Sequence, residues 1–130
     1  MTKIDPRLGK RREAEARGRR SEFLAIALLM LKGYHILARR LRTPLGEIDL
    51  VARSPTGLVC FIEVKARSEA LAAAQSLGDR QKARIGRAAM YYLAQHPKLV
   101  REGMRFDIIA VAPGRVPRHH RDAWRGDDAG

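Results

Sequence analysis

The sequence predicts an α/β domain in which a mixed β-sheet is flanked by helices. Two segments repeat apolar residues at helical spacing, and four short apolar runs have the composition of strands, in the order helix, three strands, helix, strand. The 130 residues are enough for one domain with a single core. The second helix can carry the chain back, so the last strand is expected to lie parallel to the third.

Residues 1–12 are rich in Lys and Arg and are predicted to form a basic flexible arm. A helix is expected from Glu13 to Lys32, followed by Gly33 as a left-handed stop. Its apolar residues recur at helical spacing, and these are Ala16, Phe23, Ala27, Met30 and Leu31.

Three strands are expected next, in residues 34–43 and on both sides of the loop SPTGL. Pro55 suits the first turn position and Gly57 the left-handed position of a three-residue loop, so Ser54 would pair with Leu58. In that register the numbers of facing residues sum to 112, which sets Asp49 opposite Glu63.

The second half of the chain contains a helix and a buried strand. Residues 68–78 suit either helix or loop outside the sheet. Asp79 is expected to cap a helix that ends before Pro97, with four residues facing the core, which are Ile85, Ala89, Tyr92 and Leu93. Residues 104–112 form the buried strand, so one domain spans 13–112, and 113–130 is predicted to be a polar tail.

The charge balance favours an anionic partner. There are 26 Lys and Arg residues against 14 Asp and Glu, with a net charge of +12. Nucleic acid, in particular DNA, is the first partner to consider, although a ribosome-surface or membrane-adhering protein would share this charge.

The chain is expected to be cytoplasmic. Cys60 is the only cysteine, so no internal disulfide forms, and a buried thiol fits a reduced compartment. The longest apolar run, 23–31, is too short to span a bilayer, and no signal peptide precedes it, so no membrane partner is expected.

Acidic residues interrupt the apolar hairpin around the SPTGL loop. The predicted register places Asp49 opposite Glu63 and Glu47 opposite Lys65, with all four on one face. Two opposed carboxylates repel each other unless a cation or a proton intervenes, and Mg²⁺ or Mn²⁺ would relieve them. Lys65 would then orient or deprotonate an attacking water, or offset charge on a phosphate.

An ordinary explanation is open for part of this pattern. Glu47 and Lys65 alone would form a cross-strand ion pair on a solvated face. However, the residues in step with them include Val51, Val59 and Phe61, which are apolar, and charges within an apolar face are typical of a site. Both readings stay open on the pattern alone.

The sequence contains an Asp, then 13 residues, then Glu-x-Lys, on a hairpin that follows a helix carrying an acid. This arrangement resembles the PD-(D/E)xK, or restriction-endonuclease-like, nuclease superfamily. Within it, the segments 21–53, FIEVKAR (61–67) and RFDIIAV (105–111) resemble the YraN-like family of uncharacterised bacterial proteins, which is related to archaeal Holliday junction resolvases. The likeness runs from about residue 20 to 111 and implies the restriction-endonuclease-like αβββαβ core.

The resemblance also implies roles for particular residues. Asp49, Glu63 and the backbone carbonyl of Val64 would be metal ligands, Lys65 the catalytic lysine, and Glu22 a further catalytic acid. From the residues alone, Glu22 is equally a solvated acid near a helix start. Two positions depart from the family, with Ser21 in place of Gly and Arg40 in place of Asn, and they affect substrate contacts more than the metal set.

A basic surface would hold the nucleic acid. Arg80, Arg84, Arg87 and Tyr91 fall on one face of the second helix, although a solvated helix face would look the same. The other candidate contacts are Arg39, Arg40, Arg42, Arg67, Gln81 and Lys82. They would meet the phosphate backbone, so sequence specificity is not expected. His119 and His120 are expected to be solvated.

The leading hypothesis is a magnesium-dependent endonuclease for branched, flapped or single-stranded DNA, in recombination, repair or uptake. A homodimer would be needed where a symmetric junction is cut on two strands. The alternatives are a non-catalytic nucleic-acid-binding accessory protein with the same fold, and a module that binds an acidic protein.

Overall fold

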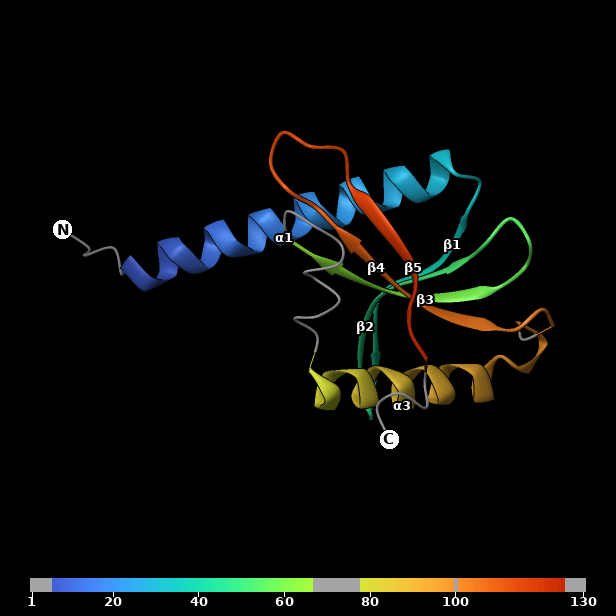
Figure 1. Cartoon of the computed structure of the whole chain (residues 1–130). Coiled ribbons are helices and arrows are strands. Elements are labelled where there is room, and N and C mark those ends of the chain that lie inside the picture. The colour runs from blue at the N-terminus through green and yellow to red at the C-terminus, as the bar shows by residue number, and fades with distance from the viewer. Residues whose placement is uncertain (1–5, 67–77, 100, 126–130) are drawn as a thin grey trace.

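The computed structural model describes residues 6–66, 78–99 and 101–125, and Figure 1 shows their arrangement. The elements are α1 (Pro6–Leu31), β1 (His35–Thr43), β2 (Gly46–Arg53), β3 (Val59–Lys65), α3 (Asp79–Gln95), the short 3₁₀ helix η1 (Pro97–Leu99), β4 (Met104–Ala110) and β5 (Arg118–Trp124). Apart from η1, the described elements up to β4 follow the predicted order of helix, three strands, helix and strand, so the α/β fold class is confirmed.

The sheet has the strand order β1-β2-β3-β4-β5. Only β3 and β4 run parallel among these neighbours, and the other pairs are antiparallel. The parallel pair confirms the predicted crossover, since α3 returns the chain to the starting end of the sheet. Helix α1 lies on one face of the sheet and α3 on the opposite face (Figure 1).

Each face of the sheet buries its own apolar cluster. Phe61 and its neighbours pack against α3, where the four predicted core residues of that helix are all buried. On the other face, Ala25 and Leu29 of α1 pack against Leu50 and Ile62. The two clusters hold β2 and β3 between two apolar layers, so any charged group on their inner parts is costly to bury.

The loop between β2 and β3 has the predicted geometry. The Ser54 amide donates to the Leu58 carbonyl at 2.8 Å, and Gly57 has a φ of 96°. The paired residues run from Arg53↔Val59 to Leu50↔Ile62, and their numbers sum to 112. The predicted register is therefore confirmed over this stretch.

Gly46, at the tip of the β1–β2 hairpin, is required by both backbone and packing. Its φ is 153°, and an added Cβ would lie 2.6 Å from Cγ of Arg84 and 3.3 Å from the Arg84 carbonyl oxygen. We expect Gly46→Ala to lower the free energy of unfolding in urea by about 1–3 kcal/mol. Gly86→Ala is the matched control, because a Cβ there meets nothing within 4 Å and should raise stability. Equal effects of the two substitutions would contradict this explanation.

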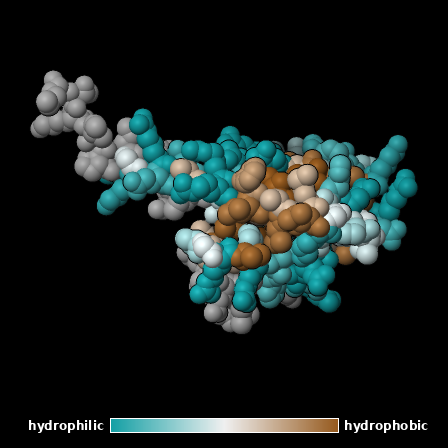
Figure 2. All heavy atoms as spheres, turned by 90° about the horizontal axis from the view of Figure 1, so that it is seen from above, coloured by the Kyte–Doolittle hydropathy of each residue, from teal (hydrophilic) through white to brown (hydrophobic). Residues whose placement is uncertain are grey.

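Helix α1 differs from the prediction in its start and in its buried face. It begins at Pro6, so residues 6–12 of the predicted arm are helical. Phe23, Met30 and Leu31, whose helical spacing predicted this helix, are 68%, 63% and 87% exposed. Figure 2 looks down on this side, where apolar side chains gather over the C-terminal half of α1. The segment is apolar on several sides, so its spacing did not determine which side meets the sheet.

The ends of α1 and α3 follow local signals with one exception. The predicted stop at Gly33 is confirmed, since its φ is 86° and the Tyr34 amide donates to the Leu29 carbonyl at 2.9 Å. Gly78, rather than Asp79, is the N-cap of α3, and Asp79 lies in the first turn. There its carboxylate still interacts favourably with the positive end of the helix dipole.

The prediction of a polar tail after residue 112 is wrong for 118–124, which form β5 along the edge of β4. Trp124 is buried, and the side chain of His119 is only 3% exposed, so the expectation that His119 is solvated is also wrong. The strand has no apolar alternation of its own. Pairing with β4 and a buried carboxylate on that strand hold it in place.

Cys60 is fully buried in β3, as predicted for an inert thiol. Burial first, and then the charge of Asp107, raise the pKa of this thiol to about 12. The predictions for residues 1–5, 68–77 and 126–130, and for Arg67, lie outside the described residues. Within the described parts of the chain, no helix has the length and apolarity needed to cross a membrane.

Candidate active site

The carboxylates of Asp49 and Glu63 come together where β2 and β3 separate. The paired stretch ends at Leu50↔Ile62, and one step further the Val64 amide donates to Oδ2 of Asp49 at 2.8 Å. The Asp49 side chain of β2 thus accepts the Val64 amide at the point where backbone hydrogen bonds between β2 and β3 end. Glu63 is buried, and its Oε2 has no hydrogen-bond partner among the described residues.

This pairing is electrostatically unfavourable without a cation. Burial, followed by the negative charge of Asp49 and a hydrogen bond with its side chain, raises the pKa of Glu63 to about 8. The charge of Lys65 acts in the opposite direction, which indicates that the lysine lies within electrostatic reach of Glu63. The site therefore holds an acid that keeps its proton near neutral pH unless another positive charge approaches.

Glu47 does not join this group. The predicted pair between Glu47 and Lys65 is wrong, because β2 and β3 no longer pair at that distance from the loop. Instead Nε of Arg42 lies 3.4 Å from Oε1 of Glu47 across the β1–β2 hairpin, with both side chains largely exposed. Such an exposed pair adds little to stability.

Glu22 on α1 binds two arginines of β1. Its Oε1 accepts from Nε of Arg39 at 3.1 Å, and its Oε2 accepts from Nε of Arg40 at 2.8 Å. Glu22 is 7% exposed, whereas both arginine side chains are more than half exposed. The reading of Glu22 as a solvated acid is therefore excluded, and its carboxylate fixes the strand to the helix.

Arg40 has a φ of 48°, in the left-handed region. Asn, the usual residue of the resembled family at this position, adopts that conformation more readily than Arg does. The bond to Glu22 offsets the cost in this chain. Arg40 lies in β1 opposite Asp49, between the pairs Arg39↔Leu50 and Leu41↔Ile48.

A cleft of about 720 Å³ opens between α1, the β1–β2 hairpin and the end of β3. Glu22, Asp49 and Val64 line it, together with Arg40 and Arg42. Glu63 and Lys65 do not line the cleft; Glu63 is buried beside Asp49 and Lys65 is half-buried. The structure thus brings three of the five predicted catalytic and metal-binding residues to one cleft. Glu63 lies next to Asp49, and Lys65 lies within electrostatic reach of Glu63.

These residues fit a divalent metal of the oxygen-binding kind. The described residues contain no group of three or more His, Cys, Asp or Glu side chains arranged around a metal. Mg²⁺ does not need such a group, because it keeps several waters and uses one or two carboxylates. Asp49 and Glu63, whose Oε2 has no hydrogen-bond partner among the described residues, would be two such ligands. A cation between them would oppose the burial and the charge of Asp49 that raise the pKa of Glu63.

The predicted nucleic-acid contacts divide between two places. Arg40 and Arg42 line the cleft, and Arg39 lies beside Arg40. Arg80, Arg84 and Arg87 are exposed on α3, on the other face of the sheet. Gln81 and Lys82 are half-buried near the start of α3 and do not line the cleft.

Sequence reasoning missed a buried polar cluster on the α1 side of the sheet. Asp107 is completely buried in β4, and both of its oxygens accept bonds from Arg105 at 2.8 Å. Nε2 of His119 lies 2.8 Å from Oδ2, and the Asp122 amide donates to Oδ1 at 3.0 Å. Arg105 also donates to the Tyr34 hydroxyl at 2.7 Å. Arg105 lies two residues before Asp107 and so on the same face of β4, which was the available signal in the sequence. Tyr34 and His119 are distant in the chain, and no local pattern predicted their place in the cluster.

The fold and the cleft together define a class of protein, a mixed α/β domain with an acidic pair at the end of its central strands. The chain belongs to the family described as Uncharacterised protein family UPF0102, whose family model matches residues 21–111. This is the relationship that the sequence resemblance predicted. The matched range contains the acidic pair and ends before β5.

Relatives of the same family resemble this chain over nearly its whole length. A UPF0102 protein of Maricaulis maris is 52% identical over 92% of this chain and 94% of its own. One from Parvibaculum lavamentivorans is 51% identical over 83% of this chain and 80% of its own. One from Agrobacterium fabrum is 46% identical over 93% and 98%, respectively.

Proposed function

We propose that the protein is a magnesium-dependent endonuclease that hydrolyses phosphodiester bonds in branched, flapped or single-stranded DNA, in recombination, repair or uptake. The observation that carries the proposal is the pair of Asp49 and Glu63, two carboxylates in contact, of which Glu63 is buried and has one oxygen without a partner in the part of the chain that the structure describes. A purely structural role accounts poorly for this pair, because burial and the charge of Asp49 both oppose ionisation of Glu63, a cost that an apolar residue at this position would not carry. The resemblance to PD-(D/E)xK nucleases adds support.

The site would work through its own groups as follows. Asp49, Glu63 and the carbonyl of Val64 would hold Mg²⁺ or Mn²⁺, which when bound supplies positive charge to the phosphate and activates water. Lys65 would orient the attacking water or offset the charge on the phosphate. Water forms a new P–O bond as the bond to the leaving oxygen breaks, and the leaving oxygen takes up a proton.

Arginines around the cleft support an anionic polymer as substrate. Arg40 and Arg42 line the cleft, and their side chains are 56% and 81% exposed. Glu22 binds Nε of Arg40, and within the described parts of the chain the terminal nitrogens of this guanidinium have no hydrogen-bond partner, so they are suited to phosphate oxygens. Glu22 would then position the arginines rather than take part in the reaction.

The test is a titration with Mn²⁺, followed by calorimetry, of the wild type and of the Asp49→Ala, Glu63→Ala double variant, with and without a short DNA junction. We expect binding in the wild type that is absent in the variant. Cleavage of branched, flapped, single-stranded and duplex DNA is then measured with Mg²⁺ or Mn²⁺, with the double variant as control.

Wild-type protein that binds no metal, even with DNA present, and cuts none of these substrates would overturn the nuclease proposal. If the same protein still bound DNA in a salt-dependent way, and neutralising the two acids left binding unchanged or tighter, it would be a non-catalytic nucleic-acid-binding protein.

A further inference from the structure

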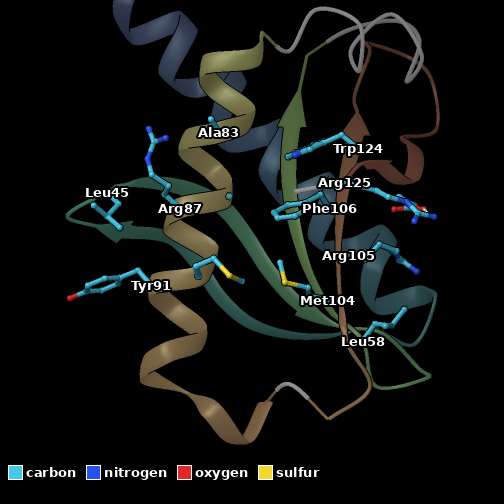
Figure 3. A pocket seen from close by; sticks show the side chains of 13 residues that line it. Leu45, Leu58, Ala83, Arg87, Tyr91, Met104, Arg105, Phe106, Trp124 and Arg125 are labelled. Carbon is cyan, nitrogen blue, oxygen red and sulfur yellow. Dashed lines mark ion pairs between the residues drawn. The ribbon is translucent and has the colours of Figure 1, made fainter. Parts of the chain in front are cut away.

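A second hollow, an apolar groove of about 1030 Å³, lies on the α3 side of the sheet. Leu45 of the β1–β2 hairpin tip and Met90 of α3 form its rim, and they are 46% and 53% exposed. Met104, Phe106 and Trp124 line it from β4 and β5. Figure 3 shows that Phe106 and Trp124 extend from the sheet towards α3. The mechanism proposed above uses none of these residues.

The groove is lined by a tryptophan whose ring nitrogen is a hydrogen-bond donor. Nε1 of Trp124 is buried and has no hydrogen-bond partner among the described residues. Trp124 itself is 3% exposed, and its ring stacks on Phe106 with 5.0 Å between the ring centroids. A buried donor without an acceptor is unfavourable, and a ligand that offers one acceptor to an otherwise apolar groove would correct this.

Positive charge stands beside the groove. Arg87 of α3 lines it, is exposed, and continues the stripe of Arg80 and Arg84. Arg125 lines the opposite side and lies 3.9 Å from the carboxylate of Asp122. A ligand that suits both the apolar groove and the arginines beside it has a flat apolar body, a hydrogen-bond acceptor at the edge of that body, and a negative charge next to the body.

A nucleobase with its phosphate has this composition. A peptide would bring backbone N–H and C=O groups, which need more partners than one indole donor. An acyl chain would leave the indole unpaired. Bases, in contrast, bind apolar and aromatic side chains through their faces while arginines hold the backbone.

We propose that this groove binds an unpaired nucleobase of a strand whose phosphates lie along the arginines of α3. The inference rests on the proposed function only in that nucleic acid is the partner. The hairpin tip joins the two hollows, since Leu45 lines the groove while Arg42 and Glu47 line the cleft. One strand crossing the tip would contact both, which gives a reason for preferring DNA with unpaired bases.

Trp124 provides a direct readout, because it is the only tryptophan in the chain. The fluorescence emission of Trp124 is followed while the full chain is titrated with a single-stranded oligonucleotide. A second titration uses an oligonucleotide of equal length that is built from abasic sites. The two ligands have the same phosphates. We expect the emission to change only with bases present, and binding to be at least about tenfold tighter.

Two exposed methionines give a matched pair of variants. Met90→Glu puts a carboxylate at the rim of the groove, and Met30→Glu makes the same change on α1, where Met30 is 63% exposed. Met90→Glu should lose the preference for bases and the emission change, while Met30→Glu should keep both. Circular dichroism checks that both variants are folded.

The proposal is overturned if the abasic ligand binds equally well with the same emission change, if no oligonucleotide binds, or if both variants behave alike. An emission that shifts with protein concentration alone would assign the groove to a second copy of the chain instead. The Asp49→Ala, Glu63→Ala variant should retain base binding. If this variant loses cleavage but keeps the emission change, the result agrees with both proposals. If the wild type binds bases but cuts no substrate, only the nuclease proposal is overturned.

Discussion

Glu63→Gln is expected to abolish cleavage and, in the presence of a chelator, to make the protein more stable. The amide keeps the shape of the side chain but cannot carry the negative charge that a metal needs, so we expect a loss of activity of about 10³-fold or more. In the folded protein the pKa of Glu63 is about 8, well above the ordinary value of 4.5.

The direction of the stability change follows from this raised pKa. Between pH 4.5 and 8 the folded chain holds a proton that the unfolded chain has released, so wild-type stability falls as pH rises through this range. The Gln side chain does not titrate, and the variant should be more stable at pH 8 by about 1–3 kcal/mol. Chemical denaturation in chelator at several pH values measures this difference.

Adding millimolar Mg²⁺ should reduce or reverse the difference, because the metal stabilises the wild type and not the variant. Glu47→Gln provides the control, since that exposed carboxylate pairs with Arg42 and lies outside the acidic pair. A Glu63→Gln protein that is less stable than the wild type at pH 8 in chelator would show that the carboxylate contributes to the fold, and would remove the main argument for a metal there.

The second large effect concerns Asp107, the completely buried carboxylate of β4. Asp107→Asn leaves Arg105 without its bidentate partner, with an Arg105 side chain that is 15% exposed. We expect the free energy of unfolding to fall by about 3 kcal/mol, as for other buried pairs that lose one member. The strand β5 should separate first, because His119 and the Asp122 amide bind the same carboxylate.

This prediction includes a pH dependence. Burial by itself would raise the pKa of Asp107, but hydrogen bonds from His119, Arg105 and the Asp122 amide outweigh it and lower the pKa below the ordinary 3.8. The stabilisation is therefore present above pH 3.8 and is lost as pH falls through the lower pKa of the folded state. The difference between wild type and variant should shrink in acid.

Hydrogen exchange of β5 amides and denaturant unfolding measure the two parts of the effect. Asp122→Asn is the matched control on β5, since it neutralises an exposed carboxylate and leaves its backbone amide in place. We expect it to change stability by less than about 0.5 kcal/mol. Similar effects of the two substitutions would contradict the role given to Asp107.

Much of this protein could be predicted from local patterns in its sequence. The turn residues Gly33 and Gly57 have the conformations that only a few residue types adopt readily, so they fixed the end of α1 and the register of β2 with β3. That register, together with strand alternation, was enough to bring Asp49 and Glu63 together. Nothing beyond the chain order was needed to expect the parallel pairing of β3 and β4.

Other features depend on contacts between distant segments. Arg42 is the partner of Glu47 because β1 and β2 continue beyond the point where β2 and β3 separate. The strand β5 has a polar sequence and forms because β4 offers it an open edge and the buried Asp107.

The sequence by itself therefore determined the order of the elements up to β4, the register of the central hairpin and the acidic pair, since each depends on neighbours in the chain. Only the tertiary structure decided which side of α1 is buried, that Glu22 binds two arginines, and that Trp124 lies in an apolar groove. These depend on which surfaces meet in space, and helical spacing or composition along the chain does not specify that.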